Sequence, residues 1–192
     1  LHREFDVTGV TLRGGHLIVP IWWTNDTPRQ LHIGKVSGEL RFLPNDQWEL
    51  NGLRAETFGV SLTLNGTVTN ASAVRRWRFG RERPEAKTLQ AFWHDLVWNF
   101  EQTRFDAPSE IVAIISGDAR DLGTFRANLH LNSPAIDSPF GRGRNLMASV
   151  DITPQAGKLI HAEVKLQAED AITRWGGAAS VQLDPQVTPS LT

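Results

Sequence analysis

Apolar and polar residues alternate along most of this chain. The clearest example lies in the stretch 48–69, where every second residue from position 58 is apolar: Phe58, Val60, Leu62 and Leu64. A repeat of two residues is typical of a β-strand that buries one face. We therefore predict a strand over 56–64, with a turn at Asn51-Gly52 before it and a turn at Asn65-Gly66 after it.

The same alternation returns several times, and Gly, Pro, Asn or Asp residues separate the repeats. Arg13-Gly14-Gly15 and Pro44-Asn45-Asp46 are typical of turns, and 133–145 is typical of a loop. The polar segment around Asp118 and Asp121 has the composition of a hairpin turn. The pattern predicts nine or ten strands, drawn from 4–12, 16–23, 31–43, 56–64, 66–70, 110–118, 122–132, 145–153, 158–168 and 171–183.

One segment follows a different period. Between residues 87 and 105, apolar residues recur at intervals of three and four, at Leu89, Phe92, Trp93, Leu96, Val97 and Phe100. This spacing predicts an amphipathic α-helix over 87–105. Pro84 precedes the helix and Pro108 follows it, so the helical insertion as a whole spans 84–106.

A single helix of this length cannot cover nine strands, because neighbouring strands lie about 4.8 Å apart. The apolar rows must therefore meet a second sheet or line a trough. We expect a mainly β fold, built on a long, twisted antiparallel sheet that is curled into a groove or is sandwich-like. We also expect one domain over 1–184 and a disordered tail over 185–192. Because the chain begins with Leu1, we expect a fragment of a longer protein.

The composition narrows the possible functions. Lys and Arg number 20 and Asp and Glu number 21, so the net charge of −1 predicts no attraction to nucleic acid. We interpret the arginines of 75–83 as a solvated loop, with a contact to phosphate head groups or to a partner as the alternative. The chain has no cysteine, and no apolar run reaches the roughly 18 residues of a membrane span. We therefore expect no disulfide and no transmembrane segment.

Motifs that carry catalysis are missing from the sequence. The six histidines are scattered singly, and no His-x-His or His-Glu-x-x-His spacing occurs. A Gly-x-Ser-x-Gly elbow and a phosphate-binding loop are also missing. We expect a protein that is not an enzyme, with no catalytic residues, no metal site and no cofactor.

Two stretches share a layout with a known family. From Asn51-Gly52-Leu53 to Gly66, and from Asp121-Leu122-Gly123 to Asn132, a polar turn precedes an alternating strand. With these segments the chain resembles the AsmA-like proteins of Gram-negative envelopes, the superfamily of AsmA, TamB and YhdP, over residues 5–170. The resemblance implies a β-groove for phospholipid transport or outer-membrane assembly between the inner and outer membranes. It also implies a location in the periplasm or cell envelope, with a parent chain anchored in the inner membrane.

The resemblance further implies that the apolar rows line the groove and bind phospholipid, with neighbouring segments of the parent chain as partners. The expected lining is Phe58, Val60, Leu62, Leu64, Phe125, Leu129, Leu131, Ile160, Val164 and Leu166. Two other interpretations remain open. One is a β-sandwich module that binds carbohydrate or protein, which the seven tryptophans would suit. The other is a structural envelope scaffold whose edge strands pair with neighbouring repeats.

Overall fold

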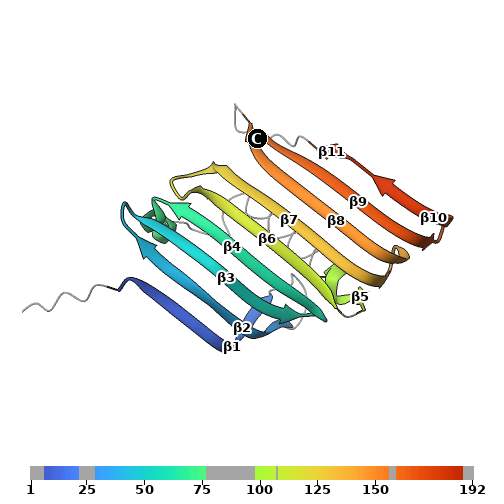
Figure 1. Cartoon of the computed structure of the whole chain (residues 1–192), viewed down its shortest axis with the longest axis horizontal. Helices are drawn as coiled ribbons and strands as arrows, with labels where there is room; N and C mark the ends of the chain where they lie inside the picture. The colour runs from blue at the N-terminus through green and yellow to red at the C-terminus, as the bar shows by residue number, and fades with distance from the viewer. Residues whose placement is uncertain (1–6, 22–28, 77–97, 107, 156–158, 188–192) are drawn as a thin grey trace, which may run out of the picture.

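The computed structural model describes residues 7–21, 29–76, 98–106, 108–155 and 159–187, which form one open β-sheet with little helix (Figure 1). The predicted mainly β fold is confirmed. The long strands are β1 (Gly9–Ile21), β2 (Arg29–Leu43), β3 (Gln47–Thr57), β4 (Val60–Thr69), β6 (Ser109–Asp118), β7 (Asp121–Ser138), β8 (Gly141–Gln155), β9 (Leu159–Thr173) and β10 (Gly176–Leu183). The short elements are the 3-10 helix η1 (Ala71–Arg76), β5 (Arg104–Phe105) and β11 (Gln186–Val187).

The strands are ordered β1-β2-β3-β4-β6-β7-β8-β9-β10 across the sheet, while β5 pairs with β7 and β11 pairs with β9. Every neighbouring pair is antiparallel except β4 and β6, which run parallel from Val60 beside Ser109 to Thr69 beside Asp118. The expectation of an antiparallel sheet is therefore wrong at this one place. A parallel pair needs a connection that returns to the starting end of the sheet. Residues 70–108 make that return, so two antiparallel blocks meet at β4 and β6.

Apolar residues of neighbouring strands line up on one face of the sheet. Directly paired residues share a face, and the pairing sets Leu62 beside Ile111, Ile111 beside Leu131, and Leu131 beside Ala148. We call this side the apolar face and the other side the polar face. The described strands form a single sheet, so no second sheet among them covers the apolar face as a β-sandwich would require.

The turn positions around β3 and β4 differ from those expected. Phe58-Gly59 forms the hairpin turn, with φ of 51° and 77°, so the expected single strand over 56–64 is two strands joined by a two-residue turn. Neither Asn-Gly pair ends a strand. Gly52 lies at an irregularity in β3, where its N–H donates to Asn65 Oδ1 on β4 over 2.8 Å. The two Asn-Gly pairs are thus hydrogen-bonded to each other across β3 and β4.

Three further strand boundaries differ from those that the sequence predicts. Arg13-Gly14-Gly15 is not a hairpin turn, because β1 continues through it with register shifts on both sides of Gly15, and the ribbon of β1 bends there (Figure 1). The expected loop 133–145 belongs to β7 and β8, which meet in a turn at Pro139-Phe140. The expected strand 171–183 is divided by a turn at Arg174-Trp175.

The predicted helix and tail fall partly outside the described residues. Residues 98–101 are helical, whereas Arg104 and Phe105 form β5. The helix therefore ends before residue 105. Residues 87–97 of the predicted helix and residues 22–23 of the predicted strand 16–23 lie outside the described part of the chain. At the C-terminal end, β11 extends strand pairing into the segment expected to be a disordered tail.

Candidate functional site

The apolar face contains two rows of side chains that cross the sheet from strand to strand. One row begins with Leu62 on β4 and continues through Ile111, Leu131, Ala148, Leu166 and Leu183. The next row runs parallel to it through Leu64, Ala113, Leu129, Val150 and Val164. Five or more strands at about 4.8 Å spacing make each row roughly 20 Å long or longer.

Most of the residues predicted as lining fall in these two rows. Leu62, Leu64, Leu129, Leu131, Val164 and Leu166 are row members. Val60 lies beside Ser109 on the same face, where it is 1% exposed. The structure therefore brings together predicted residues from β4, β7 and β9, which are far apart in the sequence.

The other three predicted lining residues have different surroundings. Phe58 lies in the β3–β4 turn rather than in a strand row. The ring of Phe125 lies over Gly117 of β6, because a Cβ on that glycine would be 2.5 Å from the ring. For Ile160, the structure describes only the backbone, which pairs with Pro154.

Sequence reasoning missed the contribution of β6 and β8. The run 111–115 is apolar throughout, and in the structure Ile111, Ala113 and Ile115 lie on the apolar face while Val112 and Ile114 lie on the polar face. Ile114 is 52% exposed. In a run that is apolar throughout, hydrophobicity does not show which residues lie on which face of the sheet. Only the pairing with neighbouring strands, whose residues do alternate, shows it.

The two faces also differ in exposure. The row members on β4, β6, β7, β8 and β9 are half-buried. On the polar face, His130, Asn132, Lys165 and Gln167 are exposed. Because the strand rows pack side by side, the apolar side chains shield one another even within a single sheet.

At one end of the sheet, hydrogen bonds connect the β2–β3 turn to η1. The Asp46 carboxylate accepts hydrogen bonds from the N–H and the hydroxyl of Ser72, over 2.9 Å and 2.6 Å. The hydroxyl bond is the largest cause of the lowered pKa of Asp46; burial opposes it, while the Ser72 N–H and the positive charges of Arg120 and Arg75 support it. This turn thereby fixes the start of η1. The rest of the basic run, 77–83, lies outside the described residues.

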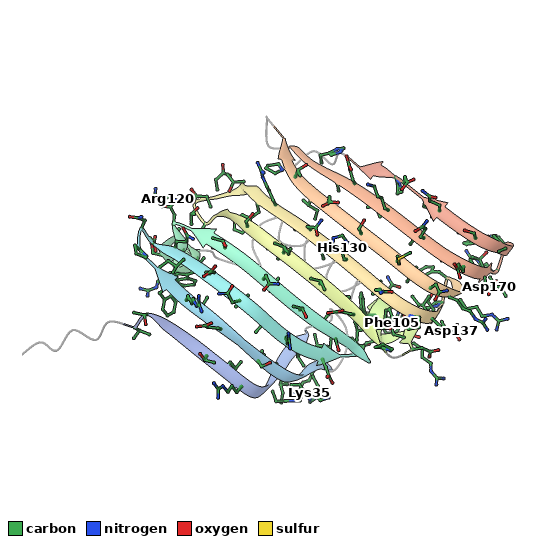
Figure 2. The ribbon with its side chains drawn as sticks, viewed as in Figure 1. Lys35, Phe105, Arg120, His130, Asp137 and Asp170 are labelled. Atoms are coloured by element: carbon green, nitrogen blue, oxygen red, sulfur yellow. The ribbon has the colours of Figure 1, made fainter. Side chains whose placement is uncertain are left out.

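The β6–β7 turn lies at the same end of the sheet and is also held by hydrogen bonds. Asp118 accepts hydrogen bonds from the side-chain amide of Asn70, over 2.7 Å, and from the N–H of Arg120, over 2.8 Å. Asp121 accepts one from the N–H of Gly123 over 2.9 Å. Both carboxylates thus act in turn structure, and the hairpin-turn interpretation of this segment is confirmed. Figure 2 shows Arg120 at this end of the sheet.

At the opposite end, two buried serines join the start of β6 to β7. The hydroxyls of Ser109 and Ser133 lie 2.7 Å apart, and the Ser133 hydroxyl donates to the Ala135 carbonyl oxygen over 2.7 Å. The Asp106 N–H also donates to the Ala135 carbonyl oxygen, over 3.0 Å. These contacts set the position of β5 beside the end of β7.

A charged recess of about 620 Å³ lies at this second end. Its lining includes three arginines and three aspartates: Arg104, Arg142, Arg144, Asp106, Asp137 and Asp170. The only ion pair among these six joins Arg144 and Asp170 over 3.7 Å, with both side chains exposed. Arg142 pairs in the sheet with Asp137, which follows Ala135 along the apolar face. The part of the recess formed by Asp137 and Arg142 therefore lies on the apolar face, between the rows and this end of the strands.

The described residues contain no group of three or more metal-ligating side chains. His16 and His32 approach to 3.3 Å, and His161 lies 3.4 Å from Glu163. The apolar rows offer apolar contacts to a ligand, and the charged recess offers charged side chains of both signs.

Comparison with protein-family models, curated proteins and solved structures finds no match for this chain. Among the described residues, no helix has the length and the apolar character needed to cross a membrane.

Proposed function

We propose that the apolar face binds the acyl chains of phospholipids, and that the protein is a non-enzymatic component of phospholipid transport or outer-membrane assembly in a Gram-negative envelope. The observation that carries this proposal is the pair of apolar rows on one face of a single open sheet. The rows continue across β4, β6, β7, β8 and β9 without a charged residue. The resemblance to AsmA-like proteins supports the same proposal.

The chemistry of the rows suits a carrier. Burial of apolar surface contributes about 25 cal/mol per Å², or about 0.8 kcal/mol for each methylene group. Contacts of this kind have no preferred direction, so an acyl chain can shift along a row without breaking a specific bond. A face without fixed polar anchors binds many acyl chains alike. We therefore place the lipid in contact with Leu62, Leu64, Leu129 and Val164.

The scaffold interpretation is the second candidate, and the edge strand β1 favours it. Val10, Leu12 and Leu17 are exposed on the apolar face of β1, and β1 has no partner beyond β2 among the described strands. An open edge can pair with a neighbouring segment of a longer parent chain. Such pairing would extend the apolar face, so it also suits a longer lipid path.

A lipid-binding assay with substitutions on each face tests the proposal. The double variant Leu62→Thr, Leu129→Thr uses β-branched threonine, which favours strands, and introduces hydroxyls into both rows. Titration with a fluorescent phospholipid should show at least about tenfold weaker binding than in the unchanged protein, since two apolar contacts are lost. Circular dichroism checks that the variant retains its sheet.

Ile114→Thr is the matched control, because Ile114 lies on the polar face of a central strand. We expect this variant to bind lipid as the unchanged protein does. Equal binding by all three folded proteins would contradict the proposal, because the rows would then have no part in lipid binding.

A further inference from the structure

The connections at the two ends of the sheet differ in chemistry. At the end with Asp46 and Arg120, the described turns consist of Pro44-Asn45-Asp46 and Ala119-Arg120. At the other end, each described hairpin turn contains an aromatic residue: Phe58, Phe140 and Trp175. Figure 2 places Arg120 at the first end and Asp137 and Asp170 at the second. We call the second end the aromatic end.

Two of these aromatic side chains project into solvent. Trp175 is 75% exposed and Phe140 is 61% exposed, which are the largest exposed fractions among the apolar residues that the structure describes. Their turns are neighbours, because Thr173 pairs with both Gly141 and Gly176. The two rings therefore extend from adjacent hairpin tips.

The two tips share one hydrogen-bond arrangement. In Ser138-Pro139-Phe140-Gly141, the Ser138 hydroxyl donates to the Gly141 carbonyl oxygen over 2.8 Å and accepts from the Phe140 N–H over 3.3 Å. In the second tip, the Thr173 hydroxyl donates to Gly176 over 3.1 Å and accepts from the Trp175 N–H over 3.2 Å. Both tight turns thus carry an aromatic residue at the same position of a hydrogen-bonded backbone.

Charges of both signs lie directly behind the tips. The charged recess contains the three arginines and three aspartates named above, and the Arg174 guanidinium lies 4.2 Å from the Trp175 ring centre. Guanidinium groups bind phosphate oxygens well, and carboxylates attract an ammonium group. A zwitterionic phospholipid head group carries both of these charges.

We propose that the aromatic end docks on a phospholipid bilayer, with Phe140 and Trp175 in the interfacial region and the charged recess facing the head groups. Aromatic residues, and tryptophan in particular, favour the interface between head groups and acyl chains. Two projecting rings offer too little area for a stable protein interface, which buries about 1,200–2,000 Å². A bilayer needs no matching pocket, so it accepts separate rings. Docking does not require the proposed lipid path, but it would place the charged recess, which lies beside the apolar rows, at the membrane.

Vesicle flotation tests this docking with the whole chain. We expect the unchanged protein to float with vesicles of phosphatidylethanolamine and phosphatidylcholine. The double variant Phe140→Ser, Trp175→Ser should bind at least about tenfold more weakly, because both interfacial rings are lost. Ile114→Ser is the matched control, since it removes an exposed apolar side chain, 52% exposed, from the centre of the polar face. It should float like the unchanged protein.

A second measurement, of tryptophan fluorescence, needs only a single substitution. Phospholipids with bromine on their acyl chains should quench the tryptophan fluorescence of the unchanged protein, and Trp175→Phe should lose part of that quenching. Equal flotation of the unchanged protein and the double variant would overturn the proposal. Absence of any vesicle binding or quenching would also overturn it, as would binding to anionic vesicles alone that disappears at about 0.5 M NaCl.

The docking test is separable from the lipid-path test. Leu62→Thr, Leu129→Thr changes the rows and leaves both hairpin tips intact, so we expect this variant to float with vesicles. Loss of lipid binding with retained flotation would support both proposals. Retained lipid binding with retained flotation would contradict the lipid path alone.

Discussion

Leu146 and Met147 are neighbours in β8, yet they lie in very different surroundings. Leu146 is on the apolar face and 6% exposed, whereas Met147 is on the polar face and 52% exposed. Ile114 is exposed on the polar face in the same way. The comparison teaches that burial in this one-layer sheet depends on which face a residue occupies and less on its hydrophobicity.

The largest difference between the faces should appear in stability. We expect Leu146→Ala to lower the free energy of unfolding by about 2–4 kcal/mol, because it leaves a cavity beside Ser133 and its neighbours. Met147→Ala should change it by less than about 0.5 kcal/mol, since the side chain is largely in solvent. Urea denaturation of both variants measures the difference. Equal losses would contradict the assignment of the two faces.

A smaller effect is expected where the apolar face is tightly packed around a glycine. Gly117→Val places a side chain within 2.5 Å of the Phe125 ring, so we expect a loss of about 1–3 kcal/mol from overpacking. Adding Phe125→Ala should recover part of this loss, because the ring then no longer occupies the space. Additive losses in the double-mutant cycle would mean that the ring does not lie over this strand.

The smallest expected effect on stability concerns Asp46, whose carboxylate is hydrogen-bonded to Ser72 at one end of the sheet. Its lowered pKa means that the folded state favours the charged carboxylate. The resulting stability is fully present above the unfolded pKa near 3.8 and is lost as pH falls through the lower folded value. Asp46→Asn should therefore be less stable than the unchanged protein at pH 7, with a smaller difference at pH 3.

Denaturation of both proteins at the two pH values measures this change. Glu56→Gln is the control, because it removes the exposed ion pair of Lys35 and Glu56 and leaves the turn intact. A difference between Asp46→Asn and the unchanged protein that grows toward acid pH would contradict the role of the Ser72 hydrogen bonds.

Alternation predicted most of the strands because an open sheet with one polar face reproduces the period of two in its sequence. It could not predict the β3–β4 turn, because the two Asn-Gly pairs, which are typical of hairpin turns, lie within β3 and β4 and are hydrogen-bonded to each other there. The parallel pairing of β4 and β6 depends on the connection that follows Thr69, which leaves no signal in the strands themselves. Leu62, Leu129 and Val164 could be predicted as row members because polar residues flank each of them.

The contribution of β6 could not be predicted in the same way. Its run is apolar on both faces, so the choice between Ile111 and Val112 rests on the register with β4 and β7. The aromatic end was also hidden from sequence reasoning. Phe140 and Trp175 are more than thirty residues apart and become neighbours only through the pairing of β8, β9 and β10.

The measurement that tests the central claim most directly is native mass spectrometry of the protein purified without detergent, with lipid extraction from the same sample. If the apolar rows bind acyl chains, the spectrum should show protein carrying phospholipid at near-equal molar amounts, and Leu62→Thr, Leu129→Thr should carry much less. A folded, lipid-free protein, or equal lipid on the unchanged protein and this variant, would contradict the claim.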